Sequence, residues 1–334
     1  MDNRTRKKKI QTPDGKDSTF IMRTFRPSSQ AVVGTALNLN DKDEKIILSL
    51  ETDVNTEKIK STASRSYQID YAQFNKCIAI ANEIQTGGYG TVFHVKWNDE
   101  DVAAKRIDCD GGMLAACERE RSILEKLTEQ DAPNIIKLKA YCINNRMSTY
   151  YILMEYMPMD LVDFMEKNPL GVEWKVRYLI MSGITQGVAY LHSLNIIHRD
   201  IKLENVLVGD NNEIKLCDFG AAKYVDKSFE FIGTKPYIPP EVLEGKPHTK
   251  KSDIYSLGIT FFELSTTWYR MYENKTEDEI LEKIKKGKRQ AIPKDCPQEM
   301  ATLIRKCWSQ EPKKRPEAEK ILPRLHDCNR SAPS

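Results

Sequence analysis

The sequence predicts an α+β fold of two lobes, a small β-rich lobe that carries one main helix and a larger α-rich lobe. From about residue 78, short apolar runs with strand character follow one another, and one helical stretch lies among them. After Leu161 the pattern is mostly helical. The residues before this region are mostly polar and charged, with one short strand-like run at 45–50.

The first segment, residues 1–75, begins with a basic cluster that comprises Arg4, Arg6, Lys7, Lys8 and Lys9, and it continues with Ser, Thr, Asn and Asp. A run at 45–50 has strand character, but nothing nearby could bury such a strand. We therefore expect a basic, largely disordered tail over 1–75. The basic cluster is either a nuclear-import signal or a solvated run of charge, and the second interpretation is favoured.

The two lobes are predicted to form one domain over 78–328, with the β-rich lobe at 78–157 and the α-rich lobe at 158–328. One helix is expected over 113–127, because Glu120, Ile123, Leu124 and Leu127 recur at i, i+3, i+4 and i+7 on one face. Long helices are expected over 172–194 and 252–266. Strands are expected at 77–80, 91–95, 102–105, 135–142, 150–156 and 214–217.

Composition narrows the class of protein. Hydrophobic residues make up 40% and charged residues 30% of the 334 residues, which is typical of a globular chain. A net charge of only +3 argues against nucleic acid as the main partner, and no apolar run is long enough to cross a bilayer. The eight cysteines form no CxxC pair, which suits a reducing compartment, either cytoplasm or nucleus.

Two motifs in the β-rich lobe suit phosphate binding. Gly87, Gly88 and Gly90 lie between two expected strands, where glycine lets backbone N–H groups approach phosphate oxygens closely. Taken alone, this pattern is more often an ordinary hairpin turn. Lys105 ends the next strand, and Glu120 on the following helix is placed to hold its ammonium group.

Two further motifs in the α-rich lobe suit phosphoryl chemistry. In the stretch His198-Arg199-Asp200, the aspartate can accept a hydroxyl proton, and Lys202 can neutralise a phosphoryl group. Asn205 follows, and Asp218 opens an Asp-Phe-Gly sequence directly after an expected strand. Both side chains offer the oxygen atoms that Mg²⁺ prefers as ligands.

In this order and at these separations, the motifs resemble those of the eukaryotic protein kinases over about 78–328. The resemblance implies the bilobal protein kinase fold, ATP and Mg²⁺ as cofactors, and a protein as substrate. It implies that Lys105, paired with Glu120, contacts the α- and β-phosphates, and that Asp200 is the catalytic base. It also implies that Lys202 supports the γ-phosphate and that Asn205 and Asp218 hold Mg²⁺.

The resemblance also implies an adenine site. The hinge would be Met154-Glu155-Tyr156-Met157, with Met154 as gatekeeper and with Glu155 and Met157 in the cofactor site. Asp160 would lie near the ribose. The side chains that would enclose adenine are Val92, Ala103 and Leu207.

The resemblance extends to substrate and subgroup. Lys202 and Thr234 follow the pattern of serine/threonine kinases rather than tyrosine kinases. The Cys307-Trp308 pair, together with Trp97 and Cys217, resembles the tyrosine-kinase-like group. Within it the MAP kinase kinase kinases are most similar, which would make a downstream kinase the substrate, and Mos-like kinases are the rival. A pseudokinase scaffold is the other alternative, but the whole catalytic set is present.

Other residues carry structural and regulatory expectations. Gln85 occupies the place of the first loop glycine, which puts the turnover rate in doubt. Arg199 would pair with a phosphorylated residue of the activation segment, residues 218–241, with Ser228 as the first candidate, while Thr234 would hydrogen-bond Asp200. The resemblance further implies that Asp253 anchors the α-rich lobe, that Arg315 pairs with Glu241, and that an apolar spine comprises Leu124, Leu138, His198 and Phe219.

Overall fold

The computed structural model describes the backbone of 6–11 and 17–22, and then residues 66–331 with gaps at 88–89, 110–112, 169–170, 211–212, 267–270 and 273. The chain divides into two compact units, Met1–Ala31 and Val32–Ser334. The first contains strands β1 (Arg6–Gln11) and β2 (Asp17–Met22), paired antiparallel. A strand pair therefore lies inside the segment expected to be disordered, and its second strand contains β-favouring Thr19, Phe20 and Ile21. The run at 45–50 lies outside the described residues.

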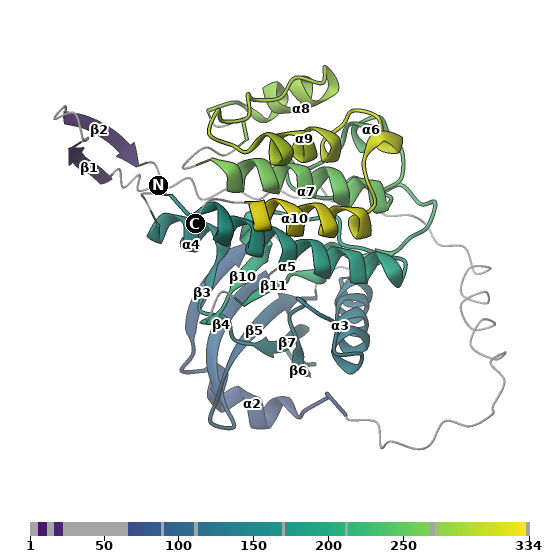
Figure 1. The fold of residues 1–334 in the computed structure, drawn as a ribbon. Helices are drawn as coiled ribbons and strands as arrows, with labels where there is room; N and C mark the ends of the chain where they lie inside the picture. Colours follow the sequence, from purple (N-terminus) through teal and green to yellow (C-terminus); the bar gives the residue numbers. More distant parts are fainter. Residues whose placement is uncertain are drawn as a thin grey trace. The chain divides into compact units, whose positions relative to one another are not determined.

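A five-stranded antiparallel sheet forms the β-rich lobe, in the order β3-β4-β5-β7-β6 (Figure 1). Its strands are β3 (Asn82–Gly87), β4 (Gly90–Trp97), β5 (Glu100–Asp108), β6 (Leu138–Asn144) and β7 (Thr149–Glu155). Helix α3 (Leu114–Glu129) buries the expected face, including Glu120, Leu124 and Leu127. The 3.6-residue periodicity therefore predicted this helix and its buried side correctly.

The strand expected at 77–80 is wrong, because Cys77 and Ile78 end helix α2 (Tyr71–Ile78), residues 79–80 form a turn, and strand β3 begins only at Asn82. The side chain of Asp70 caps α2 by accepting from the Ala72 N–H at 3.0 Å. Phe74, Cys77 and Ile78 recur at i, i+3 and i+4, and they pack against the sheet with Phe74 fully buried. The helical spacing of these three residues therefore explains why this stretch forms a helix and not a strand.

The same helix corrects the predicted boundary of the tail at residue 75. Ahead of α2, the backbone of Ile69 donates to the Tyr141 carbonyl at 2.9 Å, and Tyr141 donates to the Tyr67 carbonyl at 2.9 Å. Tyr67 and Phe74 are both buried. Residues 66–75 therefore belong to the β-rich lobe and pack on strand β6.

The α-rich lobe is built around α7 (Lys250–Ser265), whose residues from Ser252 to Ser265 are all buried. Both expected long helices, α5 (Trp174–Ser193) and α7, are present within two residues of their predicted bounds. None of the helices in the described part of the chain is long and apolar enough to cross a membrane. The other helices are α4 (Leu161–Lys167), α6 (Pro240–Leu243), α8 (Glu277–Lys285), α9 (Gln298–Cys307) and α10 (Ala318–Ser331).

Short strands carry the polar motifs of this lobe. Strands β8 (Met159–Asp160), β10 (Val206–Val208) and β11 (Ile214–Leu216) form one small sheet. Strands β9 (Ile196–Ile197) and β12 (Lys223–Tyr224) form another. Strand β9 ends three residues before Asp200, β10 begins directly after Asn205, and β11 ends two residues before Asp218. The backbone pairing of these strands therefore limits where the three side chains can point.

The four residues of the expected apolar spine are all buried. Leu124, Leu138 and Phe219 belong to one hydrophobic core that includes side chains of both lobes. The rings of His198 and Phe219 lie 5.1 Å apart between centroids. Since α3 and the segment after β11 share this core, a shift of either would disturb the packing of the other.

A buried ion pair joins α6 to the segment before α10, as the resemblance implied. Arg315 donates from both terminal nitrogens to Glu241, at 2.7 Å and 2.7 Å. Its remaining donors reach the carbonyls of Ser309 at 2.9 Å and Lys251 at 2.8 Å. Because every arm of the guanidinium group is satisfied, this pair is costly to break from one side.

Candidate active site

Lys105 lies at the meeting point of two carboxylates. Its Nζ donates to Glu120 Oε1 at 2.6 Å and to Asp218 Oδ1 at 2.8 Å, and the lysine is buried. Burial by itself would lower the pKa of Lys105, but the charges of Asp218 and Glu120 outweigh it and raise that pKa. Lys105 therefore carries a fixed positive charge at a defined position, as phosphate binding requires.

The backbone around Asp218 explains why this sequence suits the site. Asp218 adopts a left-handed conformation with φ of 58°, and Phe219 is anchored in the core behind it. A Cβ added at Gly220 would meet Asp218 Oδ1, Glu120 Oε2 and Lys105 Nζ, each at 3.3 Å. A larger residue at this position would therefore crowd the charged cluster.

Asp200 is held by hydrogen bonds from three side chains. Thr234 donates to Asp200 Oδ1 through its backbone N–H at 3.0 Å and through its hydroxyl at 2.8 Å. Lys202 Nζ lies 2.9 Å from Asp200 Oδ2 and also donates to the Thr234 hydroxyl at 2.8 Å. Asn205 Nδ2 donates to the Asp200 carbonyl at 2.8 Å and to Oδ2 at 3.1 Å. The expected bond between Thr234 and Asp200 is therefore confirmed.

Hydrogen bonds to Asp253 on α7 hold the backbone directly before Asp200. Asp253 accepts from the backbone N–H groups of His198 at 3.0 Å and Arg199 at 2.9 Å, and it lies 2.9 Å from His192 Nε2. Arg199 has φ of 70°, a conformation that needs such support outside glycine. Asp253 is thus an anchor of the α-rich lobe, as expected.

The oxygen atoms of Asn205 and Asp218 fit a magnesium ion. The amide nitrogen of Asn205 faces Asp200, so its oxygen is the atom that could act as a ligand. Within the described residues, no group of three or more His, Cys, Asp or Glu side chains could form a complete protein cage for a metal. A site of one carboxylate and one amide matches Mg²⁺, which keeps waters and shares phosphate oxygens.

The glycine-rich turn is described only in part. Gly87 ends β3 and pairs with Gly90, which begins β4, while Gly88 lies outside the described residues. Gly90 has φ of 125°, and a Cβ added there would lie 2.3 Å from the Arg106 carbonyl oxygen. Glycine is therefore required at Gly90 by backbone packing as well. Gln85 is exposed on β3, beside an irregularity in its pairing with β4.

The residues expected around adenine come from both lobes. Val92 on β4 and Ala103 on β5 are partly buried, and Ala103 pairs with Met154 on β7. In the α-rich lobe, Leu207 on β10 pairs with Asp160 on β8. The structure therefore groups these residues in two sets, and their joint contact with adenine stays a prediction.

The residues of the expected hinge, and Asp160 after it, make different contacts. One oxygen of the Glu155 carboxylate, Oε1, accepts from the Lys137 backbone N–H at 2.9 Å and from Lys215 Nζ at 2.6 Å. A Cβ added at Gly209 would lie 2.9 Å from the Met157 terminal methyl group. Asp160 caps α4 by accepting from Asp163 N–H at 2.8 Å, and burial raises the pKa of Asp160 to about 6.

Sequence reasoning missed one contact of the activation segment. Arg199 Nη1 pairs with Glu230 at 2.9 Å, whereas the Ser228 hydroxyl donates to Asp226 at 2.7 Å and accepts from Lys223 at 2.5 Å. The candidate phosphate acceptor is thus bonded to neighbours other than Arg199. Nothing in the local pattern distinguishes Glu230 from the other acidic residues of the chain.

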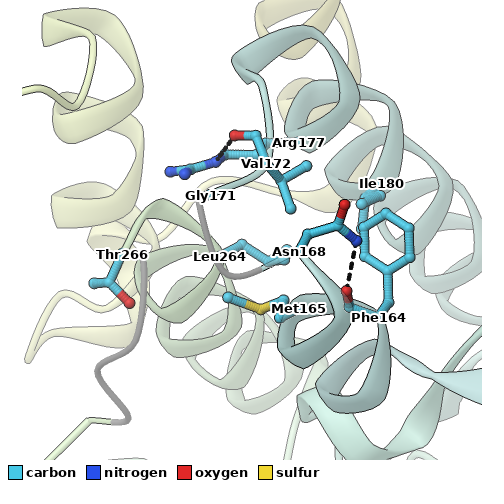
Figure 2. Close-up of a pocket in the computed structure, with 9 residues that line it drawn as sticks. All are labelled: Phe164, Met165, Asn168, Gly171, Val172, Arg177, Ile180, Leu264 and Thr266. Atoms are coloured by element: carbon cyan, nitrogen blue, oxygen red, sulfur yellow. Dashed lines mark hydrogen bonds between the residues drawn. The ribbon is translucent and has the colours of Figure 1, made fainter. Parts of the chain in front are cut away.

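A small cavity of ≈ 10 Å³ lies in the α-rich lobe, lined by residues of α4, α5 and the end of α7 (Figure 2). That volume suits about one water molecule. Arg177 lines it and donates to the carbonyls of Val172 at 2.6 Å and Ser265 at 2.9 Å. Its described lining includes none of the predicted site residues, so we interpret it as a packing void.

Comparison with known proteins finds a matching family and several similar chains. The protein kinase domain family matches residues 78–325. A probable serine/threonine-protein kinase of Dictyostelium discoideum, drkD, is 34% identical over 251 residues, which cover 74% of this chain and 19% of that protein. A mimivirus protein of Acanthamoeba polyphaga mimivirus, named as a serine/threonine-protein kinase/receptor, is 32% identical over 303 residues, 87% of this chain and 18% of that protein.

A further relative is the RGS domain-containing serine/threonine-protein kinase A of Dictyostelium discoideum. It is 28% identical over 312 residues, which cover 90% of this chain and 27% of that protein. The chain therefore spans less than about a third of the length of these relatives. The matched family range contains Lys105, Glu120, Asp200, Asn205 and Asp218. The chain belongs to the protein kinase family.

Proposed function

We propose that this chain is an ATP-dependent protein kinase that transfers the γ-phosphoryl group to serine or threonine hydroxyls. The observation that carries the proposal is the Asp200 carboxylate, which Thr234 and Lys202 hold in one orientation. The cluster of Lys105, Glu120 and Asp218 supplies the matching charged site. The named relatives are serine/threonine kinases, which supports the same assignment.

In the proposed reaction, the chain positions groups rather than forming a covalent bond to the phosphoryl group. Asp200 accepts the proton of the attacking hydroxyl as the new P–O bond forms and the bond from the γ-phosphorus to the bridging oxygen breaks. Lys202 lies beside Asp200, where its charge would stabilise the transferring group. When bound through Asn205 and Asp218, Mg²⁺ would neutralise phosphate charge.

The same contacts support serine and threonine as acceptors. Lys202 bridges the Asp200 carboxylate and the Thr234 hydroxyl, so the two residues that suggested this preference act as one unit. Burial by itself would lower the pKa of Lys202, but the charge of Asp200 outweighs it and raises that pKa. A permanent cation therefore stands next to the proposed base.

A pseudokinase scaffold is the alternative function. It would keep the fold and lose transfer, yet the side chains that transfer requires are all present and contact one another. The departure at Gln85 removes no catalytic group. We therefore place the active enzyme first.

The test compares the wild-type chain with Asp200→Asn, using ATP labelled on the γ-phosphate, Mg²⁺ and a panel of protein substrates. Asparagine keeps the size of the side chain and removes the base, so transfer should fall by roughly 10²–10⁴-fold while nucleotide binding stays. Phosphoamino-acid analysis should find phosphoserine and phosphothreonine. Equal labelling by both forms, or no labelling by either, would reject the proposal.

We propose further that the kinase is MAP kinase kinase kinase-like and that its substrate is a downstream kinase. The Cys307-Trp308 pair supports this subgroup, and both residues are buried, with Trp308 5.4 Å from Phe262 between ring centroids. The Mos-like alternative shares that pair. Catalytically inactive downstream kinases, offered against generic peptides of equal concentration, should be the better substrates, and a preference for the peptides would remove this proposal.

We propose a cytoplasmic or nuclear location as well. Support comes from the cysteines, each of which is a free thiol. Imaging of the tagged chain, with and without neutralisation of Lys7, Lys8 and Lys9, separates the two compartments. A nuclear signal that the substitutions leave unchanged would reject the basic cluster as an import signal.

A further inference from the structure

Glu230 connects two buried cations of the α-rich lobe. Its Oε2 lies 2.9 Å from Arg199 Nη1, and its Oε1 lies 3.1 Å from Lys223 Nζ. The side chains of Arg199 and Lys223 are 0% and 7% exposed, so neither charge can be compensated by water. Each oxygen of one carboxylate thus serves a different buried cation.

Both cations belong to segments that carry the proposed catalytic groups. Arg199 directly precedes Asp200, and its Nε donates to the carbonyl of Ala221, which follows the Asp218-Phe219-Gly220 turn. Lys223 lies on β12, which pairs with β9 immediately before His198. Glu230 therefore ties the activation segment to the chain on both sides of the site.

The two buried cations require a negatively charged group at the position of Glu230. A buried guanidinium group without an opposite charge is strongly disfavoured. Burial lowers the pKa of Arg199, and the carboxylate of Glu230 opposes that effect. Burial by itself would raise the pKa of Glu230, but Arg199 and Lys223 hold it below its usual range. The carboxylate is thus ionised throughout the neutral pH range.

A phosphate on Ser228 would be poorly placed to hold Arg199 and Lys223. The Ser228 hydroxyl is engaged by Lys223 and by Asp226, whose carboxylate lies 2.7 Å away. A phosphate at Ser228 would stand next to that carboxylate and compete with Glu230 for Lys223, which like-charge repulsion disfavours. The local charges therefore favour an unmodified serine.

We propose that Glu230 is a positioning residue, whose carboxylate holds Arg199 and Lys223 in place of a phosphate and orders the site without phosphorylation of the activation segment. The inference rests on the phosphoryl transfer proposed above. It adds that the unmodified chain is already in its active arrangement. An upstream kinase is then not needed to order this segment.

The first test uses the full-length wild-type chain, treated with a phosphatase and confirmed by mass spectrometry to carry no phosphate in residues 218–241. Its initial rate of transfer should stay within about twofold of the untreated chain. A fall of about tenfold that returns on rephosphorylation would overturn the inference. Absence of transfer in both forms would reject the proposed function itself, and this inference with it.

The second test compares Glu230→Gln, Glu230→Asp and Asp226→Asn. The glutamine variant keeps the size and loses the charge, so kcat should fall about tenfold or more with little change in KM for ATP. The aspartate variant should restore part of kcat, because it restores the charge. Asp226 is the matched control, since it pairs with Lys223 at 2.7 Å and is 51% exposed. Equal kcat losses in Glu230→Gln and Asp226→Asn would overturn the inference.

A double variant tests whether Glu230 acts through Arg199. If it does, Arg199→Ala combined with Glu230→Gln should have a kcat within about twofold of Arg199→Ala alone, because residues in one network are not additive. Losses that multiply would overturn the inference. Circular dichroism checks that each variant folds, and where one does not, the phosphatase experiment decides because it needs no substitution.

Discussion

At the scale of single residues, Thr234 holds the carboxylate of the proposed base, Asp200, in one orientation. Its hydroxyl donates to Asp200 and accepts from Lys202, so one oxygen atom relates the base to its neighbouring cation. Its backbone N–H makes a further bond to the same carboxylate oxygen. Asp200 is therefore held by a residue that lies 34 positions further along the chain.

Thr234→Val tests this contact. The valine keeps the shape and the backbone bond but loses the hydroxyl, and a bond to a charged group contributes about 1.5–3 kcal/mol. We expect kcat for a peptide substrate to fall about tenfold or more, with unchanged nucleotide affinity. Thr234→Ser keeps the hydroxyl and should retain most of kcat. Similar kcat values for the two variants would contradict a role for the hydroxyl.

At the scale of elements, helix α2 extends the β-rich lobe beyond the strands that the sequence suggested. The ring of Phe74 lies 5.4 Å from that of Tyr151 between centroids and packs with Val95, Val102 and Leu153. One helix thus covers side chains of β4, β5 and β7. Its loss would expose a continuous apolar surface of the sheet.

Phe74→Ala measures the stability that α2 contributes. Removing a fully buried phenylalanine costs about 3–5 kcal/mol of unfolding free energy, so Tm should fall by several degrees. Gln73→Ala, at the exposed neighbouring position, should change the unfolding free energy by no more than about 0.5 kcal/mol. Equal thermal stability of the two variants would show that α2 does not pack on the sheet.

At the scale of the whole molecule, a buried histidine makes stability depend on pH. His248 precedes α7, is 3% exposed, and has no described hydrogen-bond partner for either ring nitrogen. Burial lowers its pKa from 6.5 to about 4. The unfolded chain therefore binds a proton at His248 between these values while the folded chain does not, and stability falls as the pH drops through that window.

The expected size follows from the shift in pKa, which corresponds to about 3 kcal/mol of unfolding free energy once the pH is below 4. His248→Leu removes this contribution, so its stability relative to the wild type should rise by that amount between pH 7 and pH 4. Denaturant unfolding at both pH values gives the difference. A relative stability that does not change with pH would contradict a buried neutral His248.

The contribution of Asp160 to stability changes with pH in the opposite direction to that of His248. For this reason the test compares variants with the wild type. Burial raises the pKa of Asp160 from 3.8 to about 6, so stability at Asp160 is gained as the pH falls through that range. The wild-type chain alone would show both effects together with those of its other titrating groups, such as Asp253 and Glu230, whose pKa values are lowered. Asp160→Asn removes the opposing contribution and should leave the His248 effect visible as a steeper fall.

Much of the site could be predicted from the sequence, because its groups lie in short motifs with local spacing. Asp200, Lys202 and Asn205 fall within one loop, and the face of α3 that carries Glu120 follows from its 3.6-residue period. Such patterns need no knowledge of the fold. The same reliance on local pattern failed at 77–80, where a short apolar run is equally compatible with a strand or the end of a helix.

The sequence by itself determined the family and the two-lobe order and predicted a candidate catalytic set, since each depends on which residues follow one another. The tertiary structure alone decided that Asp218 meets Lys105, 113 positions away, that α2 belongs to the sheet, and that Arg199 pairs with Glu230 rather than Ser228. These contacts depend on how packed elements bring distant side chains together. A local sequence pattern does not encode such contacts, because distant side chains come together only when the common core forms.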